Sequence, residues 1–149
     1  MPKDRGQRVT CLGWERDSLK AEHRKPLEEP LQTGRRVLVV DDHPSFRRCA
    51  RALLSSVGFE VVGEAEDGES ALELAAELAP DLVLVDIQLP DINGFEVVER
   101  LHERDPGLVV VLISSRDRSA YGSTIGTSGA KGFISKGELS ATTLTRLLA

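Results

Sequence analysis

Short runs of aliphatic and β-branched residues recur along the chain at intervals of roughly 25 residues, and each run is too short to be a helix. Runs this apolar are typical of strands that are buried on both faces. Several of the stretches between them have the 3.6-residue periodicity of helices that bury one face. Five strands alternating with five helices predict an α/β fold, a five-stranded parallel sheet with helices on both faces. The predicted strands lie at 37–40, 60–62, 82–85, 108–113 and 132–134.

The helix after the first strand has the clearest pattern. Pro44 suits a first helical turn, and Gly58 suits the end of the helix. The apolar residues between them share one helix face: Phe46, Cys49, Ala50, Leu53, Leu54 and Val57. Further helices are expected over 67–78, capped by Asp67, and over 94–104. A short last helix is expected to bury three residues: Leu144, Leu147 and Leu148.

Residues 118–128 have the weakest helical pattern of the predicted helices. Gly122 and Gly126 fall within this stretch, and each internal glycine costs about 1 kcal/mol relative to alanine. We therefore expect the segment to be the most mobile part of the domain, with faster hydrogen exchange than the first helix.

Charge and composition exclude several classes of protein. Lys and Arg number 19 and Asp and Glu number 24, and the net charge of −5 argues against coating a nucleic acid or an anionic membrane. No apolar run approaches the roughly 18 to 20 residues of a membrane span, and the first residues contain no apolar stretch of signal-peptide length. The two cysteines, Cys11 and Cys49, do not make a disulfide framework. We therefore expect a cytoplasmic protein with free thiols.

The composition changes near residue 34. Residues 1–34 contain three prolines and a mixture of seven basic and six acidic residues, without helical or strand periodicity. We expect a disordered extension there, because so little apolar surface does not offset the entropy of ordering. Two alternatives stay open for this segment, a short docking motif at Leu12 and Trp14 and an upstream translation artefact. Residues 35–149 are expected to form the folded domain.

Side chains suited to chemistry follow four of the five predicted strands: Asp41 and Asp42, Asp86, Ser114 and Ser115, and Lys136. Ligands bind at the carboxyl ends of parallel strands, so these side chains are expected to meet at one edge of the sheet. Each residue alone is more often a helix cap or a solvated loop residue. Together, three carboxylates need a compensating cation, and oxygen ligands suit Mg²⁺. The set predicts a phosphoryl-transfer site with Asp86 as nucleophile and Asp41 and Asp42 as metal ligands.

Four segments resemble, in order and spacing, the receiver domain of two-component response regulators: VLVVDDHP at 37–44, DIQLPDINGFE at 86–96, VLISS at 111–115 and GFISK at 132–136. The resemblance covers essentially all of 35–149 and none of 1–34. It implies the flavodoxin-like (βα)5 receiver fold. The segments look most like receivers that normally precede a helix-turn-helix output domain.

The resemblance also implies a role for each site residue. Asp86 looks like the phosphoacceptor, which takes its phosphoryl group from a sensor histidine kinase. The implied ligands of Mg²⁺ are the carboxylates of Asp41, Asp42 and Asp86 and the backbone carbonyl of Gln88. Lys136 looks like the lysine that contacts the phosphoryl group. Ser114 looks like the switch hydroxyl, and Phe133 like the aromatic residue that changes rotamer with it.

Three positions bear on how closely the family pattern is followed. Gly137 follows Lys136 where many receivers have a proline joined by a cis bond, so that geometry is not expected here. Phe133 has no hydroxyl, so a switch hydrogen bond through that ring is absent. Pro90 and Gly94 are expected to shape the loop after the third strand, with the glycine permitting a positive φ.

The output of the domain is less constrained by the sequence. Thirteen residues follow Lys136, which is room for one short helix. We expect a stand-alone receiver that signals to a downstream protein without direct contact with nucleic acid or membrane; a gene truncated before its output domain is the alternative. A homodimer through the fourth helix, fifth strand and fifth helix stays open. The protein is expected to have no independent substrate, so it is not counted as an enzyme.

Two other functions were weighed against the receiver. One is a pseudo-receiver, a binding module that is never phosphorylated, which the complete set of site residues disfavours. The other is an aspartyl-phosphate phosphatase, which needs a second acid two residues after the nucleophile. Gln88 occupies that position, and its amide does not serve as a general acid.

Several further residues have a structural and a functional interpretation. His43 is expected to face solvent at a helix start, with metal ligation as the alternative. A small basic face is expected on the first helix: Arg47, Arg48 and Arg51. We expect this face to be solvated, with kinase docking as the alternative. Tyr121 and Phe133 are few and separated, so no stacking platform for single-stranded nucleic acid is expected.

Overall fold

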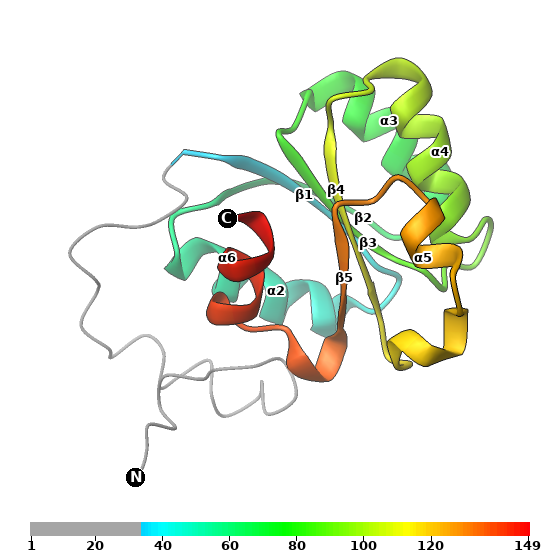
Figure 1. Ribbon diagram of the computed structural model, residues 1–149. Coiled ribbons are helices and arrows are strands. Elements are labelled where there is room, and N and C mark those ends of the chain that lie inside the picture. Colours follow the sequence, from blue (N-terminus) through cyan, green and yellow to red (C-terminus); the bar gives the residue numbers. More distant parts are fainter. Residues whose placement is uncertain (1–33) are drawn as a thin grey trace, which may run out of the picture.

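The computed structural model describes residues 34–149, and these form one parallel sheet flanked by helices (Figure 1). The strands are β1 (Arg36–Val40), β2 (Glu60–Ala65), β3 (Leu82–Asp86), β4 (Val109–Ser114) and β5 (Gly132–Ser135). Their order across the sheet is β2-β1-β3-β4-β5, and every neighbouring pair is parallel. The predicted α/β fold is therefore confirmed. The strand order reverses beside β1, between β1 and β3, which is where α/β sheets of this kind bind ligands.

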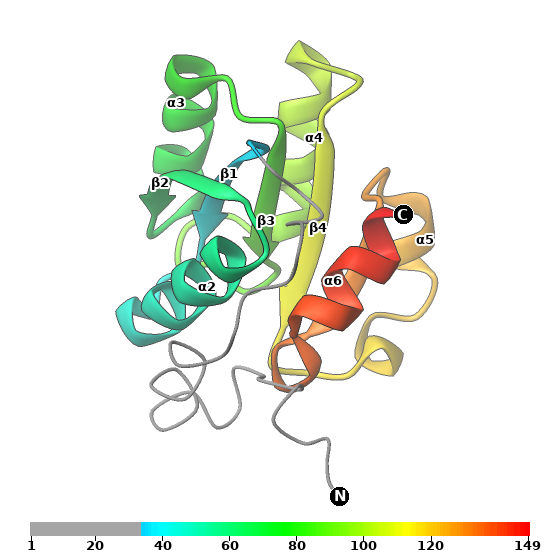
Figure 2. The same cartoon turned by 90° about the vertical axis from the view of Figure 1, so that its left-hand side faces the viewer.

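Helices cover both faces of the sheet, as Figures 1 and 2 show. The helices are α2 (Pro44–Ser56), α3 (Gly68–Leu78), α4 (Gly94–Arg104), α5 (Thr124–Thr127) and α6 (Ala141–Leu148). One apolar cluster joins α2 and α6 to the sheet, and a second joins α3 and α4 to the opposite face. Burial of an apolar face in these clusters is the main source of stability for such helices. In α6, Leu144 is buried as predicted, whereas Leu147 and Leu148 are only partly buried.

Four successive residues in each of β1 and β3 are apolar because neither face of these strands reaches water. Residues 37–40 of β1 and 82–85 of β3 are fully buried.

Side-chain caps begin helices α3 and α4: Asp67 accepts a hydrogen bond from the Ser70 N–H, and Asn93 accepts one from the Glu96 N–H. The predicted cap at Asp67 is thus confirmed, and each cap satisfies an amide that lacks a partner within its helix.

The segment 118–128 does not form the single weak helix that its sequence pattern predicted. It contains the 3-10 turn η3 (Arg118–Tyr121) followed by the single helical turn α5. Gly122 separates the two with a φ of +58°, a conformation in which a helix does not continue. The expected mobility of this segment stays a prediction.

Glycine has different roles at two other positions. Gly58 ends α2 with a φ of +100°, as predicted for a helix stop. The expected positive φ at Gly94 is wrong, since this residue begins α4 with helical backbone. Glycine is needed there for close approach instead, because a Cβ would lie 2.7 Å from the Asp86 carbonyl oxygen and 2.7 Å from the Ile87 Cα. No cis peptide bond occurs within residues 34–149.

Some expectations concern residues that the structure does not describe. The disordered extension and the motif at Leu12 and Trp14 fall on residues 1–34, of which only Gly34 is described. Cys11 lies there too, whereas Cys49 is buried in α2. None of the helices in the described part of the chain is long and apolar enough to cross a membrane.

Candidate functional site

The carboxyl ends of β1, β3 and β5 bring two acids and a lysine together. Asp41 follows β1, Asp86 is the last residue of β3, and Lys136 follows β5. The Lys136 Nζ lies 2.6 Å from Asp41 Oδ2 and 3.2 Å from Asp86 Oδ2, so it forms an ion pair with both. The same ammonium lies 4.7 Å from the centre of the Phe46 ring, a cation–π contact. The sheet edge therefore holds a partly buried cation between two buried carboxylates.

Four ligand atoms at this edge could hold a metal ion. Oxygen or nitrogen atoms of four residues lie within 4.8 Å of one another: Asp41, Asp42, His43 and Asp86. Asp41 is completely buried, and its Oδ2 is paired with the Lys136 ammonium at 2.6 Å. One ammonium lies beside a cluster of three carboxylates, so their oxygens fit an additional hard divalent cation such as Mg²⁺.

Gln88 is placed beside this cluster by its backbone. Its N–H donates a hydrogen bond of 3.1 Å to Asp86 Oδ1, and its side chain is exposed. This bond helps to hold the Asp86 carboxylate in place. Metal ligation by the Gln88 carbonyl stays a prediction.

His43 combines features of both interpretations offered for it. It is the N-terminal cap residue of α2, and 64% of its side chain is exposed, as expected for a helix start that faces solvent. Its Nδ1 nevertheless lies 3.0 Å from Asp41 Oδ1 and 3.1 Å from Asp42 Oδ1. His43 therefore lies at the rim of the acidic cluster, in contact with a buried oxygen of Asp41 and a partly exposed carboxylate of Asp42.

Burial and like charge act together on Asp86. Burial, and then the charge of Asp41, raise the pKa of Asp86 to about 6, while Lys136 and the Gln88 N–H oppose the rise. Burial alone would lower the pKa of Lys136, but its contacts with Asp41 and Asp86 outweigh burial and raise it. At neutral pH the site therefore keeps a charged lysine beside an Asp86 carboxylate that is ionised at an energetic cost.

Ser114 ends β4 with a fully buried side chain, and its hydroxyl is bonded to a residue that the sequence pattern did not indicate. Its Oγ lies 2.6 Å from the Tyr121 hydroxyl and accepts a 3.0 Å hydrogen bond from the Arg116 N–H. The Tyr121 ring lies 6.0 Å from the ring of Phe133, centre to centre. The description of Tyr121 and Phe133 as separated is therefore wrong, because the fold brings η3 against β5. The available signal was that the chain has one tyrosine, seven residues after Ser114.

The basic face of α2 is paired and is not simply solvated, which corrects the expectation. Arg47 and Arg51 donate to the two carboxylate oxygens of Glu64 at 2.9 and 2.8 Å. Arg47, with 16% of its side chain exposed, also donates a 2.6 Å bond to the Asp41 carbonyl. Burial would raise the pKa of Glu64, but hydrogen bonds from Arg51 and Arg47 lower it. Arg47 thus anchors the backbone of a candidate metal ligand, while Arg48 is exposed.

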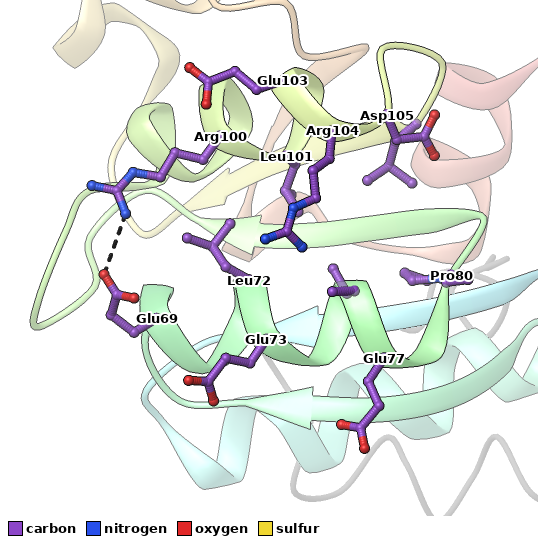
Figure 3. Close-up of a pocket in the computed structure, with 14 residues that line it drawn as sticks. Glu69, Leu72, Glu73, Glu77, Pro80, Arg100, Leu101, Glu103, Arg104 and Asp105 are labelled. Carbon is purple, nitrogen blue, oxygen red and sulfur yellow. Dashed lines mark hydrogen bonds and ion pairs between the residues drawn. The ribbon is translucent and has the colours of Figure 1, made fainter.

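A separate groove lies between α3 and α4, away from the acidic edge (Figure 3). Leu72 and Leu101 are among the apolar residues that line it, and an ion pair of 3.4 Å joins Arg100 to Glu69 across it. None of the site residues predicted from the sequence lines this groove. It is therefore independent of the acidic cluster.

Comparison with known proteins assigns the described domain to one family. The family model described as the response regulator receiver domain matches residues 37–148. The chain belongs to this family. The receiver is 39% identical over 103 residues to the virulence factors transcription regulator BvgA of Bordetella pertussis, covering 69% of this chain and 49% of BvgA. It is 34% identical over 101 residues to the DNA-binding transcriptional activator EvgA of Escherichia coli K12, covering 68% of this chain and 50% of EvgA. The receiver thus spans about half the length of these relatives.

Solved structures agree with this assignment. The signal receiver domain of the response regulator NarL from Mycobacterium tuberculosis is 36% identical, with a TM-score of 0.68, covering 78% of this receiver and 98% of that chain. A complex of CheX, CheY, BeF3 and Mg²⁺ from Borrelia burgdorferi matches with 25% identity and a TM-score of 0.74, covering 81% of this receiver and 96% of that chain. The resemblance inferred from the sequence motifs is therefore confirmed.

Proposed function

We propose that residues 35–149 act as the phosphoacceptor domain of a two-component system, with Asp86 receiving the phosphoryl group from a sensor histidine kinase. The observation that carries this proposal is the position of Asp86, a buried carboxylate between the acidic cluster and the Lys136 ammonium. A buried acid paired with an ammonium suits group transfer to the protein itself.

The transfer makes one bond and breaks one. An Asp86 carboxylate oxygen attacks the phosphorus of a phosphohistidine, the bond to the imidazole nitrogen breaks, and an aspartyl phosphate forms. With a pKa of about 6, Asp86 is mostly ionised at pH 7 and so is able to attack. Lys136, already 3.2 Å from Asp86 Oδ2, is placed to bind a phosphoryl oxygen in the product.

We assign the metal site to the carboxylates of Asp41, Asp42 and Asp86, with the Gln88 carbonyl as a further ligand. Bound Mg²⁺ would supply charge neutralisation between the carboxylates and the incoming phosphoryl group. Asp41 is held for this role by the bond from Arg47 to its carbonyl and by burial of its side chain. Orienting contacts of this kind are common behind metal ligands.

We further propose that phosphorylation is read through a protein contact on the face formed by α5, β5 and α6, with Ser114 and Phe133 as the switch residues. A homodimer through this face is one form that such a contact would take. The described domain carries an excess of acidic over basic residues, which disfavours direct contact with nucleic acid by these residues. We therefore propose that the receiver signals in its own right to a protein partner; a DNA gel shift at physiological salt with the full chain would overturn this.

The test of the phosphoacceptor is direct. The protein is incubated with acetyl phosphate and Mg²⁺ and run on a phosphate-affinity gel beside Asp86→Ala. A shifted band that needs Mg²⁺ and is absent in the variant supports the proposal. Absence of a shift in folded protein, together with absence of beryllofluoride binding, would favour a pseudo-receiver. Sustained hydrolysis of a generic phosphomonoester would instead favour a phosphatase.

A further inference from the structure

The Ser114 hydroxyl is already engaged in this state of the protein. A serine hydroxyl has one proton to donate and two lone pairs to accept with. Ser114 Oγ accepts from the Arg116 N–H at 3.0 Å and forms a 2.6 Å bond with the Tyr121 hydroxyl. Within residues 34–149 no hydrogen bond joins Ser114 to Asp86. Either hydroxyl is able to donate the bond between Ser114 and Tyr121; when Ser114 donates it, its single proton is directed at Tyr121 and must turn away before it bonds a phosphoryl oxygen on Asp86.

Tyr121 packs against aromatic rings of two other elements. Its ring packs edge-on against Phe95 of α4 at 5.8 Å between ring centres, and tilted against Phe133 of β5 at 6.0 Å. Aromatic pairs in these geometries contribute beyond their buried area. Gly122, with its positive φ, follows directly and ends η3. Packing against α4 and β5 thus positions the phenol ring, and its hydroxyl is bonded to Ser114.

Phe133 has no hydroxyl of its own, and Tyr121 is the one tyrosine of the chain. We propose that Tyr121 is a positioning residue that holds the Ser114 hydroxyl away from Asp86 until Asp86 is phosphorylated. This inference rests on the proposed function. When Ser114 exchanges its bond with Tyr121 for a bond to the phosphoryl oxygen, the Tyr121 hydroxyl is released. The Tyr121 ring then connects this change to α4 and β5, against which it packs.

The bond between Ser114 and Tyr121 opposes activation, because it stabilises only the unphosphorylated arrangement. A neutral hydrogen bond of typical net strength corresponds to a factor of about five in an equilibrium constant. Tyr121→Phe keeps the ring and removes the bond. We expect this variant to bind beryllofluoride with Mg²⁺, a mimic of the phosphoryl group, about five-fold more tightly than the parent. Unchanged or weaker binding would overturn the proposal.

The matched control uses Ser114. In a Ser114→Ala background the bond is already absent, so Tyr121→Phe should leave beryllofluoride affinity unchanged. A merely structural role for Tyr121 would give the same effect of Tyr121→Phe in both backgrounds. The double-mutant cycle therefore separates positioning of the hydroxyl from general packing.

A ¹⁹F NMR measurement tests whether the Ser114 hydroxyl leaves Tyr121. Because the chain has one tyrosine, incorporation of 3-fluorotyrosine gives one ¹⁹F label, at Tyr121. Beryllofluoride adds its own ¹⁹F signals when bound, so one titration reports site occupancy and the state of Tyr121. We expect the tyrosine signal to shift in step with occupancy, and neither change in Asp86→Ala. Bound beryllofluoride with an unmoved tyrosine signal would overturn this inference but not the proposed function. No bound beryllofluoride on folded protein would overturn both.

Discussion

Removing the charge of Asp86, the proposed phosphoacceptor, should stabilise the metal-free protein. Burial and the neighbouring Asp41 raise the pKa of Asp86 from 3.8 to about 6 in the folded state. The protonated acid is therefore favoured by folding: its stabilising contribution is fully present below pH 3.8 and is lost as the pH rises through about 6. A gap of about two pKa units corresponds to about 3 kcal/mol at pH 8. Asp86→Asn is neutral like the protonated acid and should recover about this amount.

The assay is urea unfolding of the parent and Asp86→Asn in EDTA, at pH 8 and near pH 4. The free energy of unfolding of the variant should exceed that of the parent by about 3 kcal/mol at pH 8, and the two should converge near pH 4. Glu99→Gln, which neutralises an exposed acid on α4, should stay within about 0.5 kcal/mol of the parent at both pH values. Added Mg²⁺ should narrow the difference in unfolding free energy between variant and parent at pH 8, because the proposed metal site is complete only in the parent. A variant no more stable than the parent at pH 8 in EDTA would refute this reasoning.

Three further substitutions test individual contacts by urea unfolding. Gly94→Ala places a Cβ against the Asp86 carbonyl, and overpacking of this kind should destabilise the fold by about 1–3 kcal/mol; an unchanged midpoint would contradict the close approach. Asp91→Ala removes the acceptor for two N–H groups at the start of α3 and should cost about 1 kcal/mol at pH 7. Because those amides hold the pKa of Asp91 low against the effect of burial, the loss should shrink as the pH falls through that pKa. Arg47→Met should cost about 2 kcal/mol, since charged hydrogen bonds to Glu64 and Asp41 are lost, whereas Arg48→Met at an exposed position should be neutral.

Much of the fold follows from local pattern. Residues 37–40 of β1 and 82–85 of β3 are all apolar, and a strand covered on both faces buries such a run. The helix over 67–78 begins at a capping aspartate, and its predicted bounds differ from the structure by one residue. The structure of residues 118–128 was harder to predict because two glycines weaken the local preference for a helix. Tertiary contacts of Tyr121 and Ile125 decide where this segment turns.

The candidate site likewise combines features that follow from the sequence with features that only the tertiary structure decided. That Asp41, Asp86 and Lys136 would gather at one edge of the sheet follows from sequence alone, because parallel strands end at the same edge and each of these residues stands at a strand end. The bond between Ser114 and Tyr121 and the anchoring of Asp41 by Arg47 were decided by the tertiary structure. These contacts depend on the packing of η3 and α2 against the sheet, and on side-chain rotamers chosen by that packing, which no periodicity in the chain encodes. Local preference therefore determined which residues reach the site, and packing determined which of them hold one another in place.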